Sequence, residues 1–472
     1  MSPRVAPEIL SALEAVVGSG NVLTDPDCLA AYGHDEYALT DIRRPADVVV
    51  RPKTAADVAA ILKIAGPAGI PVTARGGATG LCGGCVPLAG GIVLSLERMN
   101  QVLEIDPVNQ MAVVEAGVTL HALEKAVADA GFDFPPHPGE ESAMVGGMIA
   151  TNAGGSRAVK YGVIRNYVRG LEVVTAAGDI LTLGGKLIKS SSGYNLMHLF
   201  IGSEGTLGII TKAVIQFRPK PALTRSLVIP FDSIAAAIET VPILLGGTTV
   251  PLALEFVPLD VIRITEEHLH RTWPCHAGTV HLFVILDAFS EEDMDRQSEA
   301  MAEAALERGA IDVFIADTAA KQDNVLAIRS KIYEAVKAQT IEILDIAVPR
   351  GEIAAHVERV QAIAAKFGVW LPTFGHAGDG NVHTHLMKAR YEDGKMIPMA
   401  EAEWRASLDA VRNEIFADGL SRGGVVSGEH GIGLVKKELL AGSLPAAQLE
   451  LMRGLKRVFD PSGILNPGKI FD

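Results

Sequence analysis

Four glycine-dense stretches in the first half of the chain constrain its fold more than any other feature. They lie at residues 75–85, 138–148, 151–157 and 202–211, and each combines glycine with hydroxyl or amide side chains. Glycine lacks a Cβ, so these loops let backbone N–H groups approach a diphosphate or the edge of a heterocycle closely. One such loop is usually a tight turn. Four of them in a strand-rich region indicate a site for a large cofactor.

Composition and charge narrow the class of protein. The chain has 472 residues, 48% of them hydrophobic and 21% charged, which indicates a folded protein with more than one core. Its net charge of −14 argues against nucleic acid as a partner and against anionic membranes. Four cysteines make no disulfide framework, and no apolar run is long enough for a transmembrane segment. Glu8 and Glu14 interrupt the region where a signal peptide needs apolar residues, so we expect a cytoplasmic protein.

The hydrophobic pattern alternates between strands and helices, which predicts an α+β fold. Thr54 and Asp57 have the spacing of a capping box at the start of a helix. Two prolines in Arg218–Pro221 mark a domain boundary. Beyond it we expect further strands and helices, one helix continuing through Ile341. The predicted domains are an N-terminal helical segment (1–40), a cofactor-binding domain (41–221), a substrate domain (222–444) and a C-terminal segment that returns to the cofactor domain (445–472).

Three of the 13 histidines lie within ten residues, in the segment 374–385. A second polar segment, 427–431, follows a long predicted helix. Two imidazoles and a carboxylate suit Zn²⁺, Mn²⁺ or Fe²⁺. The Gly-Asp-Gly-Asn turn allows His376 and His383 to converge, while His383 and His385 could equally form a pair on one strand face. Ordinary hydrogen-bonded histidines are the alternative.

Two other motifs are weak. Residues 463–469 resemble the first part of a phosphate-binding loop, but Pro467 lies inside the loop and Ile470 replaces the serine or threonine. Cys82 and Cys85 have C-x-x-C spacing, but there is no second pair to complete a metal site. No G-x-G-x-x-G follows a strand, which disfavours a nicotinamide cofactor.

Several motifs taken together carry a family resemblance. The order ARGGATGLCGG, PGEESAMVGGMIATNAGG, KYGVIRNYVRGLEVV and IGSEGTLGIIT resembles the FAD domain of the vanillyl-alcohol-oxidase type, also called PCMH-type. The similarity runs from about Arg43 to Pro221, resumes at Thr373, and is greatest to the D-lactate, D-2-hydroxyglutarate and glycolate dehydrogenases. It implies a two-part FAD-binding domain and an α+β substrate (cap) domain with an antiparallel sheet.

The resemblance also implies which residues bind FAD. Ala78 and Thr79 stand where some relatives carry a histidine bonded to the flavin, so we expect a noncovalent cofactor. The implied FAD-binding residues are Arg75, Gly76, Gly77, Ala78, Thr79, Gly80, Pro138, Gly139, Ser142, Met144, Gly147, Thr151, Asn152, Gly154, Glu204, Gly208, Ile209, Ile210 and Asn466.

The chain contains the motif GHxGDGNxH followed by GEHG, as in the dehydrogenase branch. This resemblance implies the chemistry of the site. It assigns His376, His383 and Glu429 as ligands of a divalent metal, most simply Zn²⁺, and His430 as the catalytic base. The metal would lower the pKa of the substrate hydroxyl, His430 would take its proton, and a hydride would pass to flavin N5. Arg329 matches an arginine that grips the substrate carboxylate, and the resemblance leaves His376 and His385 beside the substrate.

The sequence departs at two positions from the pattern of the D-2-hydroxyglutarate dehydrogenases (the hydroxyglutarate pattern), and both affect the expected substrate. No lysine precedes Asp345 in Glu342–Asp345, and His385 replaces an asparagine. We therefore expect a dehydrogenase of a D-2-hydroxy acid resembling D-lactate. The alternatives are a glycolate dehydrogenase subunit, a D-2-hydroxyglutarate dehydrogenase, a flavin-dependent transferase or a non-enzymatic flavin carrier. We also expect a homodimer that passes electrons to a quinone, a cytochrome or an electron-transfer flavoprotein.

Overall fold

The chain divides into two units, and neither is continuous in sequence. The computed structural model describes residues 5–247 and 249–471. The first unit comprises the described parts of Met1–Gly154, Val163–Lys220 and Glu429–Asp472, and the second comprises Gly155–Gly162 and Pro221–Gly428. The third crossing, between Lys220 and Pro221, lies within the proline-containing segment Arg218–Pro221. The first unit resumes at Glu429, whereas we expected the return at residue 445, because backbone groups of residues 432–434 are already hydrogen-bonded within the first unit.

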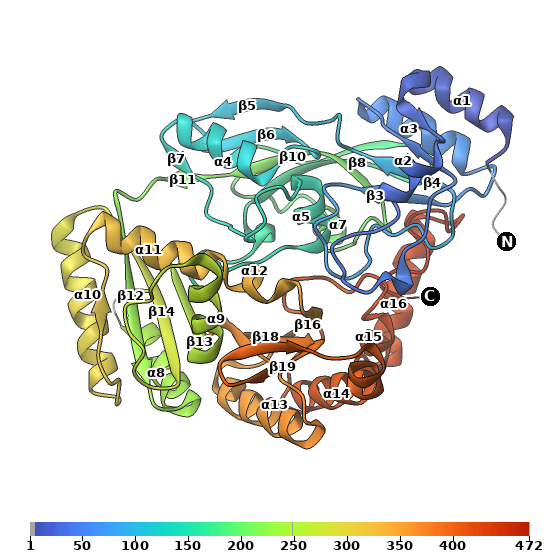
Figure 1. Ribbon diagram of the computed structural model, residues 1–472. Helices are drawn as coiled ribbons and strands as arrows, with labels where there is room; N and C mark the ends of the chain where they lie inside the picture. Colours follow the sequence, from blue (N-terminus) through green and yellow to red (C-terminus); the bar gives the residue numbers. More distant parts are fainter. Residues whose placement is uncertain (1–4, 248, 472) are drawn as a thin grey trace. The chain divides into compact units, whose positions relative to one another are not determined.

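The first unit contains two main sheets (Figure 1). The smaller sheet has the order β1-β2-β4-β3, in which β2, β4 and β3 run parallel. The predicted capping box is present: the Thr54 hydroxyl accepts from the Asp57 N–H, and Asp57 accepts from the Thr54 N–H. The strands of this sheet are β1 (Val22–Leu23), β2 (Val48–Val50), β3 (Val72–Arg75) and β4 (Ile92–Ser95), and its helices are α1 (Pro7–Val17), α2 (Pro26–Ala31) and α3 (Ala55–Ala65).

The larger sheet of this unit is antiparallel, with the order β5-β6-β10-β8-β9. Its strands are β5 (Val102–Asp106), β6 (Met111–Glu115), β8 (Val168–Val174), β9 (Ile180–Gly184) and β10 (Ile209–Gln216). A two-stranded ladder joins β7 (Phe132–Asp133) to β11 (Arg218–Pro219). The remaining helices are α4 (Leu120–Asp129), α5 (Val145–Thr151), α7 (Met197–Phe200), α15 (Lys437–Ser443) and α16 (Ala446–Phe459).

The last residues of the chain complete the first unit. Leu465 forms a parallel bridge with Val72 on β3, and the Val72 N–H donates to Ile464 O at 2.7 Å. The buried Lys469 ammonium donates to Val86 O at 2.7 Å. The edge of the first sheet is therefore built from residues almost four hundred positions apart in sequence.

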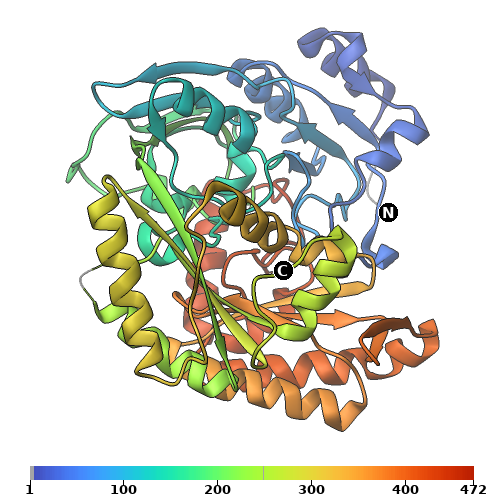
Figure 2. The same ribbon diagram turned by 60° about the vertical axis from the view of Figure 1, so that its left-hand side comes forward.

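The second unit is built on a seven-stranded antiparallel sheet of order β15-β12-β14-β13-β17-β18-β16, as expected for the substrate domain. Figures 1 and 2 show α8, α10, α13 and α14 along one face and α9, α11 and α12 on the other. The strands are β12 (Leu223–Phe231), β13 (Ala253–Pro258), β14 (Val280–Ala288), β15 (Phe314–Ile315), β16 (Thr340–Ala347), β17 (Thr373–His376) and β18 (Asn381–Met387), with a hairpin of β19 (Ala389–Glu392) and β20 (Lys395–Pro398). The helices are α6 (Ala158–Tyr161), α8 (Ile234–Gly246), α9 (Leu259–Leu269), α10 (Glu291–Leu306), α11 (Ala319–Ser330), α12 (Ile332–Lys337), α13 (Ile353–Phe367) and α14 (Glu401–Ser421).

One predicted helix is wrong at its end, and several elements, among them β13, α9 and α13, were not predicted. The helix expected to continue through Ile341 stops at Lys337, and Ile341 lies in β16. The segment Thr340–Ala347 is rich in β-branched residues and pairs along its length with β18. Strand β13 and helix α9 lie in a region where the sequence pattern predicted neither.

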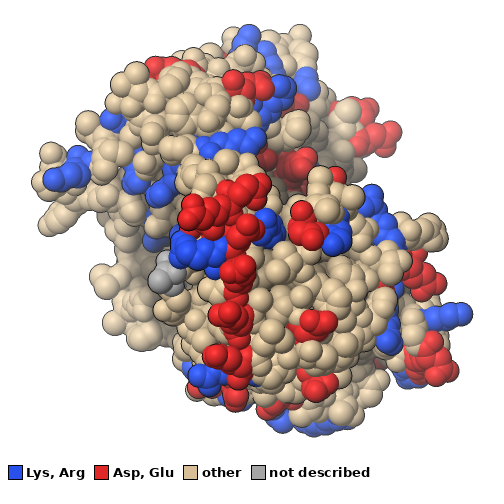
Figure 3. Space-filling model, turned by 90° about the vertical axis from the view of Figure 1, so that its left-hand side faces the viewer, with Lys and Arg blue, Asp and Glu red and all other residues tan. Residues whose placement is uncertain are grey.

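The exposed surface of the second unit carries a band of acidic side chains over α10 (Figure 3). Glu291, Asp295, Glu299 and Glu303 recur at every fourth position and are exposed. Two of them, Glu291 and Asp295, pair with Arg225. These exposed acidic side chains contribute to the net charge of −14 of the chain. Among the described residues, no helix combines the length and apolar character needed to cross a bilayer.

A buried histidine in the second unit predicts a pH dependence of stability. His281 accepts from Trp273 Nε1 at 2.9 Å through Nδ1, and its Nε2 lies 2.9 Å from Ala277 O. Burial lowers the pKa of His281 below its usual value, because the charged ring would lose its hydration. A proton on Nδ1 would also face the Trp273 donor. The unfolded chain binds that proton below about pH 6.5, so the stabilisation is complete above this pH and is lost as the pH falls through it.

The His281→Gln variant should therefore show a flatter dependence of its melting temperature on pH between pH 7.5 and 5.5 than the unchanged protein. Thermal unfolding followed by circular dichroism measures both curves. Because every other titrating group is common to the two proteins, parallel curves would contradict this assignment.

Candidate active site

Two of the glycine loops of the first unit pack directly against each other. The loop after β3 brings Gly76 and Gly77 beside Ser142 and Met144, which precede α5. A Cβ at Gly77 would lie 2.8 Å from Ser142 O, and a Cβ at Gly76 would lie 3.4 Å from the Met144 Cβ. A side chain at position 77 would therefore force the two loops apart. Gly77 is therefore needed for the two backbones to approach each other.

The third loop continues from α5. Thr151 ends this helix, and Asn152 caps it in the left-handed conformation with φ 54°. A Cβ at Gly154 would lie 2.5 Å from the Oε2 atom of Glu429. Beside Gly147, in contrast, a Cβ would meet no atom within 4 Å. The α5 region therefore combines exposed backbone with open space, as a flat cofactor requires.

Three of the predicted FAD-binding side chains hold protein groups. The Arg75 guanidinium donates to His34 O at 2.6 Å. Glu204 accepts from the N–H groups of residues 432 and 433 at 2.8 and 2.7 Å. Asn466 donates to Gly84 O at 2.9 Å and to Glu204 O at 2.7 Å. These contacts fix the loops against one another. Of the other predicted residues, Ala78, Thr79, Gly80, Pro138, Gly139 and Gly208 lie in the same loops, and Ile209 and Ile210 begin β10.

In the second unit, His376 and His383 come together on adjacent antiparallel strands. His376 ends β17, and His383 lies on β18 opposite Phe374. The turn between the strands is closed by the Gly380 N–H, which donates to His376 O at 3.1 Å, with Gly380 at φ 95°. The two imidazole rings lie 5.2 Å apart between centroids and nearly perpendicular. Of the two pairings that the spacing allows, the structure brings these two rings edge to face.

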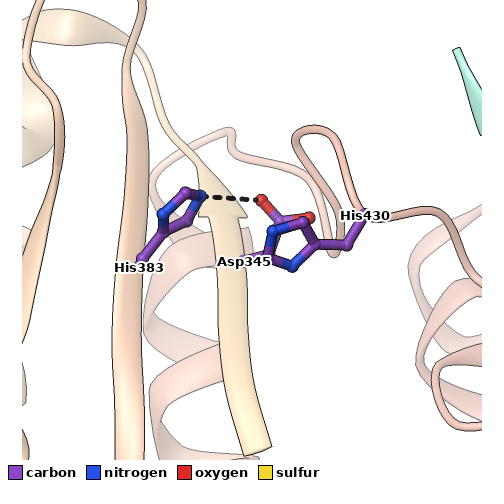
Figure 4. Close-up of side chains that lie close together, drawn as sticks. All are labelled: Asp345, His383 and His430. Atoms are coloured by element: carbon purple, nitrogen blue, oxygen red, sulfur yellow. Dashed lines mark ion pairs between the residues drawn. The ribbon is translucent and has the colours of Figure 1, made fainter. Parts of the chain in front are cut away.

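Each of these histidines has a buried carboxylate beside it. His376 Nδ1 lies 2.9 Å from Glu255 Oε1, and His383 Nε2 lies 3.6 Å from Asp345 Oδ1. Figure 4 shows the second pair; the other side chain drawn, His430, belongs to the first unit. Burial alone would raise the pKa of Glu255, but the adjacent Arg329 guanidinium and His376 outweigh it and lower the pKa to about 2.

His385 is placed differently. It is buried, stacked on Phe374 with ring centroids 4.6 Å apart, and its ring lies 5.8 Å from that of Tyr333. Its Nδ1 lies 3.4 Å from the Thr340 hydroxyl. The side chain predicted to lie near the substrate thus forms part of an aromatic wall.

Arg329, on α11, pairs with Glu255 through its Nε and Nη2 atoms. These bonds use two of the five N–H donors of the guanidinium. Sequence reasoning identified the arginine but missed both buried carboxylates. Glu255 had a signal, because it is the single charge in the apolar run 253–258, and a buried charge needs a partner. Asp345 was named only in the comparison with the hydroxyglutarate pattern, and no role in the site was predicted for it.

The chain itself connects the histidine strands to the GEHG segment. Ser427 donates to Asp345 Oδ2 at 2.7 Å, and the Gly428 N–H donates to Asp345 O at 3.2 Å. Glu429 and His430 follow directly in sequence. The donor set, two imidazoles and a carboxylate, fits a divalent transition metal.

Comparisons with known proteins agree with this architecture. Residues 46–184 match the family described as FAD binding domain, and residues 220–470 match the family described as FAD linked oxidases, C-terminal domain. A D-lactate dehydrogenase of Archaeoglobus fulgidus is 45% identical over 442 residues, which cover 93% of this chain and 95% of the relative. The glycolate oxidase subunit GlcD of Bacillus subtilis is 38% identical over 432 residues, 90% of this chain and 89% of that one.

Solved structures show the same fold at lower sequence identity. The 4-ethylphenol oxidase from Gulosibacter chungangensis aligns with a TM-score of 0.79 and 23% identity, covering 100% of this chain and 98% of that structure. The predicted fold, an FAD-binding domain of the vanillyl-alcohol-oxidase type with an antiparallel α+β cap, is thereby confirmed. The chain belongs to the family of FAD-linked oxidases, and it is an FAD-linked oxidoreductase.

Proposed function

We propose that this enzyme oxidises a D-2-hydroxy acid, with D-lactate as the favoured substrate, to the 2-oxo acid. The observation that carries the proposal is the pair His376–His383, held on adjacent strands with a buried carboxylate behind each ring. The similarity to a D-lactate dehydrogenase over almost the whole chain supports the same reaction class. FAD is proposed to be noncovalent, and His376, His383 and Glu429 to bind a divalent metal, Zn²⁺ before Mn²⁺ or Fe²⁺.

Some residues of the protein are proposed to bind the substrate and the cofactors, and His430 is proposed to transfer a proton. When bound, FAD accepts the two electrons as a hydride, and a divalent cation lowers the pKa of the substrate hydroxyl. Arg329 is proposed to hold the substrate carboxylate with the N–H groups that Glu255 does not use. His430, as a neutral imidazole, takes the hydroxyl proton. The glycine loops supply backbone contacts for the cofactor.

The substrate side chain is proposed to be small or apolar. His385 is enclosed by Phe374 and Tyr333, which leaves an aromatic wall at the position where the hydroxyglutarate pattern has an asparagine. No lysine precedes Asp345 in β16. A second substrate carboxylate would therefore lack the two partners of that pattern, and 2-hydroxyglutarate is disfavoured.

Anaerobic titration tests the reaction class and the substrate together. D-lactate should bleach the flavin absorbance in the visible range, L-lactate should not, and D-2-hydroxyglutarate should do so far more slowly. Pyruvate measured in the same samples should match the reduced flavin one to one. Bleaching by neither lactate enantiomer would contradict the proposal.

A glycolate-oxidising subunit is the second candidate, because of the similarity to GlcD. It differs in one observable: such a subunit should be inactive with a dye acceptor when purified alone. A flavin-dependent transferase would show no bleaching with any hydroxy acid. The proposal includes a homodimer in the cytoplasm, with a quinone, a cytochrome or an electron-transfer flavoprotein as acceptor.

A further inference from the structure

We propose that Glu255 is a positioning residue that holds His376 as its Nδ1–H tautomer and so directs the Nε2 lone pair toward the metal. The inference rests on the proposed function, since it assigns the group behind one of the proposed metal ligands. It also gives Arg329 a second role, because the same carboxylate joins the arginine to the histidine.

The geometry makes Glu255 a fixed acceptor. It lies on β13, the strand next to β17, and Phe256 is the partner of Gly375 in the ladder between them. Its Oε1 atom lies 2.9 Å from His376 Nδ1, and its side chain is 2% exposed. Neighbouring positions on two hydrogen-bonded strands thus set the distance between carboxylate and ring.

The carboxylate decides which ring nitrogen carries the proton. An ionised carboxylate only accepts hydrogen bonds, so at this distance Nδ1 must be the donor. In a neutral imidazole, Nε2 then has the lone pair that a metal requires. A buried carboxylate behind a metal-binding histidine also makes the imidazole a stronger donor to the metal.

Arg329 keeps Glu255 ionised and oriented. Its Nε and Nη2 atoms contact both carboxylate oxygens, the two-bond arrangement typical of arginine–carboxylate pairs. The arginine proposed to hold the substrate therefore also determines, through Glu255, the tautomer of a metal ligand.

The Glu255→Gln variant tests this role through metal affinity. The amide keeps the size of the side chain but loses the charge, so the dissociation constant for Zn²⁺ should rise about 10- to 100-fold. Competition with a chromogenic chelator measures it, and the FAD content is read from the absorbance spectrum. Saturating Zn²⁺ should restore most of the turnover, because the defect lies in metal binding.

Glu342→Gln is the matched control. Glu342 is a buried glutamate of the same sheet, on β16, and it pairs with Arg412. Its variant should bind Zn²⁺ within about twofold of the unchanged protein. Equal Zn²⁺ affinity in the Glu255→Gln variant and the unchanged protein would overturn the inference and leave the proposed function intact. If the unchanged protein binds no divalent metal, the metal part of the proposed function fails instead.

A measurement on the unchanged protein covers the case in which Glu255→Gln does not fold. Nitrogen NMR of the metal-free protein labelled at histidine reports which ring nitrogen is protonated, and a His376→Gln sample identifies the signal. We expect a protonated Nδ1 and an unprotonated Nε2 for His376. The opposite tautomer would overturn the inference.

Discussion

Replacing His430 by alanine should lower kcat for D-lactate by roughly 10²- to 10⁴-fold while FAD remains bound, which is the usual contribution of a general base. We expect the decrease in kcat because the imidazole acts on the hydroxyl group of the substrate, whereas the substrate is bound through its carboxylate. The fold around it should persist. The segment after His430 is held by backbone N–H groups of Ile432 and Gly433 on Glu204, and these need no imidazole.

Steady-state kinetics with a dye acceptor measure this loss, and the visible spectrum measures bound flavin. His121→Ala is the matched control, since His121 is a well-exposed histidine of the same unit, on α4. It should retain kcat within about twofold. Turnover near that of the unchanged protein in His430→Ala would remove this residue from the mechanism.

Removing divalent metal should abolish D-lactate oxidation without releasing the flavin. The proposed ligands are side chains of β17, β18 and the GEHG segment, whereas the proposed FAD loops depend on backbone geometry at positions such as Gly76 and Gly77. Treatment with EDTA followed by gel filtration should give a yellow, inactive protein. Added Zn²⁺ or Mn²⁺ should restore the activity.

A parallel sample treated with EDTA already saturated with Ca²⁺ controls for effects of the chelator itself. Metal content by mass spectrometry, measured before and after, links activity to occupancy. Full activity in protein that contains no divalent metal would refute the ligand set of His376, His383 and Glu429. That result would not contradict the proposed roles of FAD and His430, which are tested separately.

Local patterns predicted much of the fold. The capping box at Thr54 rests on residues three positions apart, and the pattern of Ala55–Ala65 repeats every three to four residues, so both were visible in sequence. The convergence of His376 and His383 was one of two possibilities, because a glycine turn between two short strands brings its ends together. In each case the contacts that matter are close in sequence.

The missed features depend on contacts that are distant in sequence. Glu255 contacts His376 across 121 positions and Arg329 across 74. Strand β13 was not predicted, and its place between β14 and β17 is set by pairing with both. Ile341 was assigned to a helix because β16 forms by pairing with β18, which is distant in sequence. The only local indication of this strand is its content of β-branched residues. Strand neighbours follow from the topology of the whole sheet.

The bridge between Val72 and Leu465 has a consequence for how the protein is made. The ribosome releases the N-terminal strands long before residues 464–469 exist, yet these residues complete the edge at β3 and contact the loops at Gly84 and Val86. The second unit, in contrast, has all the strands of its seven-stranded sheet by Met387. Its sheet therefore has the opportunity to form before residues 464–469 are synthesised, whereas the edge of the FAD-binding unit at β3 is complete only once these residues are present.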